Sequence, residues 1–343
     1  MRFIGGKSLL LDEIINVIKT NTKNVNSVID IFSGSGVVSQ RLKLEGYSTL
    51  SNDFLYFSYI LNRGTIALNT LPTFDKLDIK NPIEYLNSLT IDDTDIELEK
   101  CFIYNNYSPN EKCSRMYFQN KNALKIDIIR ITIEDWYKSG KLTDDEYYYL
   151  LASLISAVPY VSNITGVFAA YLKEWDVRTY NDLILEDFGI IQSDKVCSAF
   201  NKDCNELLPE IKADLLYADP PYNARQYLPN YHVLETIARY DYPELYGVTG
   251  MRNYDNQKSC FCQRSKVRQA FENMISKAQV KYVVISYNNE GLLSTEELTD
   301  ICKSYAKKDT FKLVEIDYRR YKSKIPNNKK GLKEQLYFFE KEQ

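Results

Sequence analysis

The chain has 343 residues, which is long enough for one large domain with an insert or for two domains. It carries 43 Lys and Arg against 46 Asp and Glu, and its formal net charge of −3 argues against indiscriminate coating of nucleic acid. No stretch reaches the ~18 apolar residues that a membrane span needs, and the first residues carry no signal-peptide pattern. The seven cysteines are scattered and there is a single histidine, so we expect a protein of the reducing cytoplasm, without a metal site and without a membrane partner.

The first predicted elements are a glycine turn and a helix. Residues 3–7 read Phe-Ile-Gly-Gly-Lys, and apolar residues then recur at helical spacing from 8 to 20. The N-terminus of a helix presents backbone donors to an anion, and Lys7 would add a positive charge there. This pattern alone does not identify a ligand.

A strand, a glycine turn and a second helix follow, which together form the first unit of a nucleotide-binding sheet. Residues 28–45 read as a buried strand, a turn containing Gly34 and Gly36, and a helix. A second strand ends at Asp53. An acid at this distance from the glycine turn can accept hydrogen bonds from the hydroxyls of a ribose. Ser39 stands where a dinucleotide fingerprint has its third glycine, which favours a smaller adenosine ligand.

The composition changes after Pro72. Residues 73–187 mix acidic segments, aromatic residues and short helical stretches without the earlier rhythm, and we interpret them as an inserted domain. Within this segment, residues 163–168 form a polar turn between apolar neighbours. Its spacing also fits an ordinary tight turn.

The succession of strands and helices resumes at residues 195–200, a strand-like run that is followed by Asp203. That acid lies either near the same ligand edge as Asp53 or at the cap of a surface helix. The next apolar run, residues 215–218, stops at the sequence Asp-Pro-Pro-Tyr. Because neither proline can extend a strand ladder, we expect Asp219 at the carboxyl end of a buried strand, where ligands bind in an open α/β sheet.

This loop suits transfer of a group to the exocyclic amine of adenine. The nitrogen of that amine is a poor nucleophile because its lone pair is delocalised into the ring, so a catalyst should accept both N–H bonds. The carboxylate of Asp219 and the main-chain carbonyl of Pro220 are candidates for the two acceptors, and Tyr222 could stack on a base taken out of the helix. The alternative is a simple Asx-Pro turn that closes a strand.

The last part of the chain supplies further strands and a basic stretch. Residues 280–287, 311–318 and 335–339 read as strands. Aromatic residues alternate with cations at 318–324, which fits either phosphate contacts or a solvated hairpin. We expect the single histidine, His232, to be a packed or hydrogen-bonding helix residue.

Together these pieces resemble the Dam-like class of adenine-specific DNA methyltransferases, which includes the modification enzymes of restriction systems. The resemblance covers most of the chain and rests on four motifs and on their order. They are Phe-Ile-Gly-Gly-Lys at 3–7, Asp-Ile-Phe-Ser-Gly-Ser-Gly at 30–36, Asn-Asp at 52–53 and Asp-Pro-Pro-Tyr at 219–222. In this class an inserted target-recognition domain lies between the glycine loop and the catalytic loop, as the insert does here.

The resemblance implies a set of roles for individual residues. The residues implied to bind S-adenosylmethionine are Phe3, Lys7, Asp30, Phe32, Gly34, Gly36, Asp53, Asp203 and Asp219. The implied catalytic residues are Asp219, Pro220, Pro221 and Tyr222. The residues implied to contact nucleic acid are Asn163, Arg225, Tyr287, Asn288, Arg319, Arg320 and Lys322. Phe3 stands where the family often has tryptophan or tyrosine, and Cys204 stands where an apolar residue would cover the adenine of the cofactor.

We therefore expect an α/β fold, a Rossmann-like methyltransferase sheet with an inserted, mainly helical target-recognition domain. Residues 1–72 and 188–343 would form the catalytic domain and residues 73–187 the insert. The predicted activity is transfer of methyl from S-adenosylmethionine to N6 of adenine in double-stranded DNA with base flipping, and a cognate restriction endonuclease is a possible partner. Two alternatives remain: methylation of another planar amine, such as cytosine N4, adenine in RNA or a glutamine amide, or a DNA-binding specificity subunit without catalysis.

Overall fold

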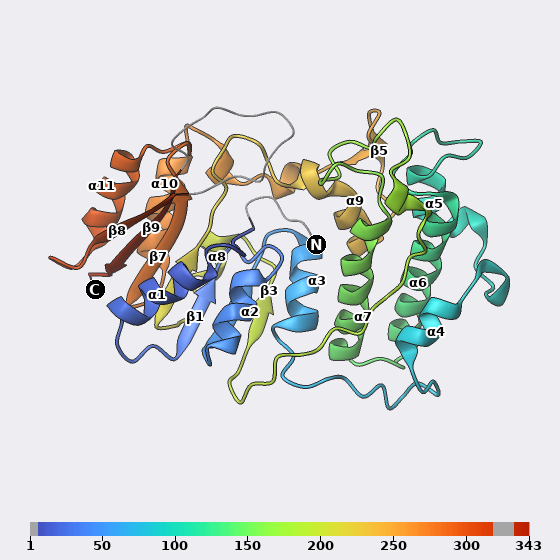
Figure 1. Cartoon of the computed structure of the whole chain (residues 1–343), viewed down its shortest axis with the longest axis horizontal. Helices are drawn as coiled ribbons and strands as arrows, with labels where there is room; N and C mark the ends of the chain where they lie inside the picture. Colours follow the sequence, from blue (N-terminus) through green and yellow to red (C-terminus); the bar gives the residue numbers. More distant parts are fainter. Residues whose placement is uncertain (1–5, 318–332, 343) are drawn as a thin grey trace.

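The computed structural model describes residues 6–317 and 333–342, and it has two parts that lie side by side (Figure 1). A twisted sheet flanked by helices forms one end of the molecule, and a group of long helices forms the other. The predicted α/β class is confirmed, since the sheet is mainly parallel.

The sheet has seven strands in the order β3-β2-β1-β4-β7-β9-β8. Five strands run parallel: β1 (Ser27–Asp30), β2 (Ser48–Asn52), β3 (Ser198–Phe200), β4 (Leu215–Ala218) and β7 (Tyr282–Asn288). Strand β9 (Lys333–Glu340) lies antiparallel between β7 and β8 (Lys312–Asp317). Because β9 is reversed, its first residues lie beside the last residues of β7.

The register brings the ends of the parallel strands to one edge. Ile29 pairs with Leu216, and Leu216 pairs with Val283, so the apolar centres of β1, β4 and β7 are aligned. Both faces of β4 are buried, as expected for a central parallel strand that reads as a continuous apolar run. Asp30 ends β1, and Asp219 directly follows β4 at the same edge.

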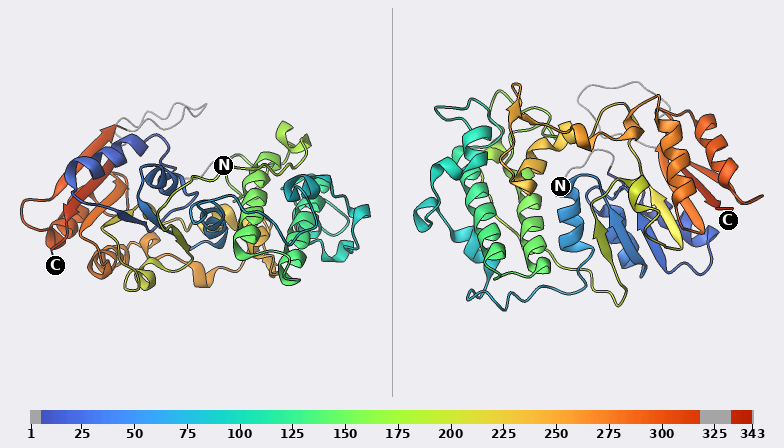
Figure 2. Two further views of the ribbon diagram at one scale, coloured as in Figure 1. Left: turned by 90° about the horizontal axis from the view of Figure 1, so that it is seen from below. Right: turned by 180° about the vertical axis from the view of Figure 1, so that it is seen from behind.

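Helices cover both faces of the sheet, as the edge-on view shows (Figure 2). One face packs against α1 (Leu11–Asn21) and α2 (Val37–Leu44). The other packs against α8 (Cys204–Leu207), α10 (Val267–Lys277) and α11 (Thr295–Tyr305). This arrangement leaves the carboxyl edge of the central strands as the place where loops gather.

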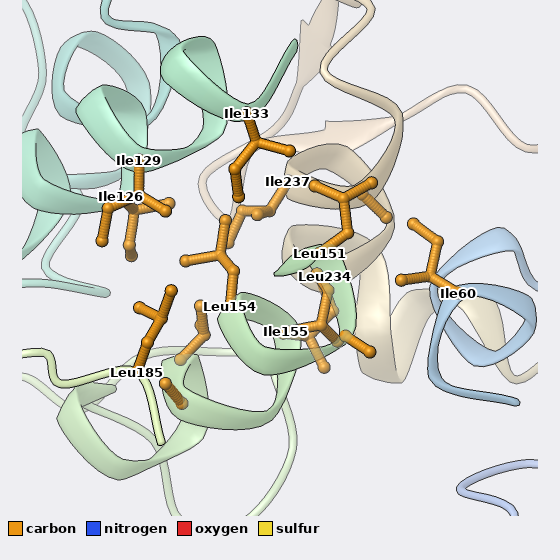
Figure 3. Close-up of a cluster of buried hydrophobic side chains, with 14 of the residues drawn as sticks. Ile60, Ile126, Ile129, Ile133, Leu151, Leu154, Ile155, Leu185, Leu234 and Ile237 are labelled. Atoms are coloured by element: carbon orange, nitrogen blue, oxygen red, sulfur yellow. The ribbon is translucent and has the colours of Figure 1, made fainter. Parts of the chain in front are cut away.

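The second part of the molecule is helical and has its own apolar core (Figure 3). Its helices are α3 (Tyr56–Thr65), α4 (Pro82–Ser88), α5 (Phe102–Tyr107), α6 (Asn120–Lys138), α7 (Asp144–Ala157) and α9 (Leu228–Arg239). Ile60 of α3 and Ile237 of α9 belong to the same core as Ile129 of α6 and Leu154 of α7. Residues 73–187 are thus mainly helical and share their core with helices from both flanking segments, while their role as a recognition domain stays a prediction.

Short elements complete the connections. A small antiparallel pair joins β5 (Leu245–Tyr246) to β6 (Met251–Arg252). Short 3-10 helices occupy Ile91–Asp93, Leu98–Lys100, Val158–Val161, Val177–Tyr180, Asp255–Gln257 and Cys260–Cys262. Across the two described ranges, no helix is both long and apolar enough to cross a membrane. The same residues contain no group of three or more His, Cys, Asp or Glu side chains arranged to hold a metal ion.

Candidate functional site

A cavity opens at the carboxyl edge of β1, β2 and β4. Its empty space is about 1000 Å³, including the open solvent at its mouth. Many of the predicted cofactor and catalytic residues line it together: Lys7, Asp30, Phe32, Gly34, Asp53, Asp203, Asp219 and Pro221. Predicted cofactor residue Phe3 lies outside the described residues.

The glycine turn shapes one wall of the cavity. Gly34 and Gly36 have φ angles of 52° and 79°, in the left-handed region that glycine adopts without steric cost. A Cβ atom at Gly36 would lie 2.8 Å from Oδ1 of Asn62, and Nδ2 of Asn62 donates a 3.1 Å hydrogen bond to the carbonyl of Gly34. Asn62 comes from α3, so the helical part of the molecule supports the turn.

Asp53 joins the glycine turn to the start of α3. Its carboxylate accepts hydrogen bonds from the amides of Gly34 at 2.8 Å and Leu55 at 2.9 Å. Burial raises the pKa of Asp53 to about 6, and these backbone donors oppose the rise. A carboxylate has about four lone-pair directions, so the side chain retains acceptor capacity for the hydroxyls of a ribose.

Asp30, in the wall of the cavity, has one carboxylate oxygen for which the described residues supply no hydrogen-bond donor. Its Oδ2 accepts a 2.6 Å hydrogen bond from Ser39, whereas no group among the described residues donates to Oδ1. The side chain is 1% exposed, and burial raises its pKa to about 7, with the Asp219 and Asp53 carboxylates adding to the rise. An ionised ligand donor placed here would satisfy Oδ1 and favour the charged carboxylate.

The N-terminal turn meets the predicted catalytic loop, residues 219–222, over Asp219. Nζ of Lys7 lies 3.0 Å from Oδ1 of Asp219, and the hydroxyl of Tyr222 donates a hydrogen bond to the same oxygen. Nζ of Lys7 also contacts the Tyr222 hydroxyl. Burial raises the pKa of Asp219, while Lys7 and Tyr222 oppose that rise.

The ring of Tyr222 is held from two sides. Tyr287 of β7 meets it edge to face, with 5.2 Å between ring centroids, and Nζ of Lys7 lies 4.7 Å from its centroid. The amide of Leu292 donates a 2.8 Å hydrogen bond to the carbonyl of Tyr222. Tyr287 is itself 1% exposed, and it lies too close to Gly291 for any side chain there, since a Cβ would be 2.1 Å from its ring. The loop conformation is therefore set by packing behind it.

Those predicted DNA-contacting residues that the structure describes lie outside the walls of this cavity. Asn163 is fully buried, with Nδ2 bonded to the carbonyl of Leu172 and Oδ1 accepting from the amide of Asp176, both at 2.9 Å. Arg225 is exposed just after the catalytic loop, whereas Asn288 is 7% exposed at the end of β7. Arg319, Arg320 and Lys322 lie outside the described residues. Direct contacts of this set with DNA stay predictions.

Asp203 and His232 both make structural contacts, and of the two only Asp203 lines the cavity. Asp203 lines the cavity and also caps α8 by accepting a 2.8 Å hydrogen bond from the amide of Asn205. His232 is fully buried in α9, with Nε2 3.3 Å from the hydroxyl of Tyr117, and burial lowers its pKa to about 4. The expectation of a packed histidine is confirmed.

Several residues of the site carry no signal in the sequence. Phe261 packs edge to face on Phe32, with 5.1 Å between centroids, and it comes from a segment without any motif. Glu235 of α9 is fully buried and accepts hydrogen bonds from two amides at the start of α3, from Arg239 and from Gln257. A carboxylate inside an amphipathic helix has many roles, so only the folded chain reveals that this one fixes the helix next to Asp53.

The chain matches a family model over residues 3–301, that of the D12 class of N6 adenine-specific DNA methyltransferases. It is 44% identical over 346 residues to the type II methyltransferase M.FokI of Planomicrobium okeanokoites, a match that covers 100% of the chain and 53% of that protein. It is 41% identical to the modification methylase StsI of Streptococcus sanguinis, over 99% of the chain and 52% of that protein. The type II methyltransferase M.NlaIII of Neisseria lactamica is 34% identical, over 96% of the chain and 95% of its own length. The chain thus spans about half the length of the first two relatives.

Proposed function

The chain belongs to the D12 class of N6 adenine-specific DNA methyltransferases, and from this membership we propose that it moves a methyl group from S-adenosylmethionine to N6 of an adenine at a specific site in double-stranded DNA. The target base would be flipped out of the helix to reach the catalytic loop. One observation carries the proposal: Asp219 and the glycine turn at Gly34 line the same cavity. Donor and acceptor could therefore meet inside it.

The residues of the cavity fit S-adenosylmethionine. Oδ1 of Asp30 has no donor among the described residues and could receive the ammonium of a methionyl group, while Asp53 could accept from a ribose and Phe32 could cover an apolar surface. The glycine turn gives the backbone room to approach the ligand. When bound, this cofactor supplies a methyl group attached to a positively charged sulfur, which becomes a neutral thioether as the methyl leaves.

The chain's own part in the reaction is to orient and activate the amine. The Asp219 carboxylate and the Pro220 carbonyl would each accept one N–H of the amine, which aims the nitrogen lone pair at the methyl carbon. The amine nitrogen would take the methyl group of the bound cofactor, and the carboxylate of Asp219 would take up one amine proton along its hydrogen bond. Tyr222 would stack on the flipped base, and Pro221 would stiffen the loop.

The helical part and the exposed cations would serve duplex binding. We propose residues 73–187 as the target-recognition segment, with Arg225 near the DNA backbone. The words "type II" and "modification methylase" in the names of the relatives support a place in a restriction-modification system, with an endonuclease that reads the same site.

Modified-base sequencing of DNA from cells that express the chain tests the proposal. The expected result is N6-methyladenine at one sequence context, absent with Asp219→Ala and retained with Asp300→Asn, a matched change of an exposed acid on α11. N4-methylcytosine, or modification of RNA alone, would instead support the alternative acceptors. No modified base together with no binding of S-adenosylmethionine in calorimetry would support a non-catalytic subunit.

A further inference from the structure

Two carboxylates, Asp219 and Glu334, share two donors at the edge of the cavity. Oε2 of Glu334 lies 3.8 Å from Nζ of Lys7 and 3.5 Å from the hydroxyl of Tyr222. The same ammonium lies 3.0 Å from Asp219, to which the same hydroxyl donates its hydrogen bond. The Tyr222 hydroxyl and the Lys7 ammonium are therefore closer to Asp219 in this structure. A small movement of either donor would bring it to Glu334, which is a second acceptor.

The reversed direction of β9 explains how Glu334 reaches this edge. It is the second residue of β9 and pairs with Asn288, the last residue of β7. An acid near the start of an antiparallel strand thus lies beside the carboxyl ends of the parallel strands, where the catalytic loop is. Its side chain is 7% exposed, so the position is not a solvated surface acid.

Two donors already contact one oxygen of Asp219, the carboxylate that the target amine needs as an acceptor. The Tyr222 hydroxyl and the Lys7 ammonium both contact Oδ1, and although Oδ2 keeps acceptor capacity, these donors draw charge from the whole carboxylate and weaken the hydrogen bond that it offers the amine. A donor that gives up a buried acceptor without gaining another loses a free energy of roughly 1–3 kcal/mol, which would oppose capture of the base. A second acceptor nearby removes that cost.

We propose that Glu334 is a positioning residue that receives the Tyr222 hydroxyl, and draws the Lys7 ammonium, when the target amine takes Asp219. The inference rests on the proposed function and deepens it, because it assigns to Glu334 the preparation of the acceptor for the flipped adenine. Glu334 touches neither the base nor the cofactor in this role. It acts through Tyr222 and Lys7.

A purely structural ion pair would give a different result. If Glu334 only stabilised the fold, its loss would affect the free energy of unfolding and would add independently to the effect of any change at Tyr222. If it competes with Asp219 for the hydroxyl, its loss should matter less once that hydroxyl is gone. A double-mutant cycle measures this coupling.

The test uses Glu334→Gln, Tyr222→Phe and the double variant. The matched control is Glu315→Gln, an acid on neighbouring β8 whose carboxylate pairs with Lys333 at 2.8 Å on the surface. The DNA is a duplex with the sequence context found by modified-base sequencing. Single-turnover methylation measures the rate, 2-aminopurine fluorescence at the target position measures base capture in the presence of S-adenosylhomocysteine, and calorimetry measures cofactor binding.

We expect Glu334→Gln to slow single-turnover methylation by about tenfold and to lower the 2-aminopurine signal, because the neutral amide no longer draws the Lys7 ammonium and is a weaker acceptor for the Tyr222 hydroxyl, so that both stay on Asp219. Cofactor affinity should remain that of the unchanged chain, and Glu315→Gln should leave all three measurements unchanged. With Tyr222→Phe present, the loss caused by Glu334→Gln should shrink to roughly threefold or less. If Glu334→Gln does not fold, as judged by circular dichroism, Glu334→Asp replaces it in the same cycle.

The outcomes separate the two proposals. If the unchanged chain methylates DNA but the effects of the two substitutions multiply, or if Glu334→Gln has no effect, then Glu334 does not position the acceptor. If the unchanged chain methylates no DNA at all, the proposed function itself is wrong, and the role of Glu334 falls with it.

Discussion

The amide of Phe168 donates a 2.7 Å hydrogen bond to the carbonyl of Asn230, which ties the turn at residues 163–168 to the first turn of α9. Helix α9 begins a few residues after the catalytic loop, and its first residue, Leu228, lines the cavity. A movement of the turn on binding DNA would therefore act directly on the segment next to Tyr222. This connection joins residues 163–168 to the segment that follows residues 219–222.

Asn163→Ala should weaken methylation of DNA without weakening cofactor binding. The substitution removes two hydrogen bonds that close the loop to Leu172 and Asp176, and neither residue lines the cavity. We expect kcat/KM for DNA to fall roughly tenfold, with the dissociation constant of S-adenosylmethionine unchanged. Asn87→Ala is the control, since the side chain of Asn87 also donates one hydrogen bond and accepts one, both with the backbone of Leu185 elsewhere in the helical part. Equal effects of the two variants on kcat/KM would contradict a special role of the turn.

Gly36→Ala should lower cofactor affinity by more than the backbone strain of the substitution alone would cause. The φ angle of 79° is unfavourable for alanine, and the new Cβ would also press on Asn62, which holds the turn. Gly46→Ala has comparable strain, with a φ of 87°, and no atom within 4 Å of the new Cβ. We expect both variants to lose roughly 1–2 kcal/mol in free energy of unfolding and only Gly36→Ala to lose cofactor affinity, as measured by calorimetry. Retained affinity in Gly36→Ala would show that the turn does not approach the ligand.

Local patterns predicted the sheet well because each strand carries its own signal. The apolar run with its glycine turn at residues 28–36, and the run that ends at Asp219, appear as β1 and β4. The predicted strand at 335–339 appears as β9, although its reversed direction is a property of pairing that no single strand encodes. The glycine, acid and catalytic-loop motifs likewise meet in one cavity, since parallel strands present their carboxyl ends at one edge.

The sequence did not predict the contacts between distant segments, because these segments show no distinctive pattern of residues. Glu235 binds the start of α3 across 178 positions of sequence, and Glu334 meets Lys7 from the other end of the chain. A buried acid gives no periodic signal, because its burial depends on partners that are known only after folding. The sharing of one helical core by α3, α9 and residues 73–187 was missed for the same reason.

Tyr222→Ala should lower base capture while leaving cofactor binding intact. The ring offers a surface for stacking, and loss of one base–aromatic stack costs roughly 1–3 kcal/mol, or about fivefold to 150-fold in the methylation rate at limiting DNA. The main-chain bond from Leu292 to the carbonyl of residue 222 does not require the side chain, so the loop should keep its course. Tyr246→Ala, at a tyrosine that is 49% exposed on β5, is the control. An unchanged rate and an unchanged 2-aminopurine signal in Tyr222→Ala would argue against a stacked base.

The buried carboxyl of Asp30 should make the stability of the cofactor-free protein depend on pH. Burial raises the pKa of Asp30 from 3.8 to about 7, so the folded state favours the neutral acid, and ionisation with rising pH opposes folding. The neutral Asp30 carboxyl makes its full contribution to the stability of the folded state at pH values below the unfolded pKa near 4. This contribution is lost as the pH rises through about 7. This loss amounts to roughly 2–3 kcal/mol between pH 5 and pH 8 for this group alone.

Asp30→Asn removes that ionisation while keeping an oxygen that can accept the hydrogen bond from Ser39. In urea unfolding without cofactor, the variant should gain more stability relative to the unchanged chain at pH 8 than at pH 5. Cofactor affinity should fall at both values, because the amide cannot pair with an ammonium group. Asp300→Asn, an exposed acid on α11, should leave the difference between the two pH values unchanged. An equal response of Asp30→Asn at pH 5 and pH 8 would mean that Asp30 is already ionised in the folded protein across this range, and a different group would then have to compensate its buried charge.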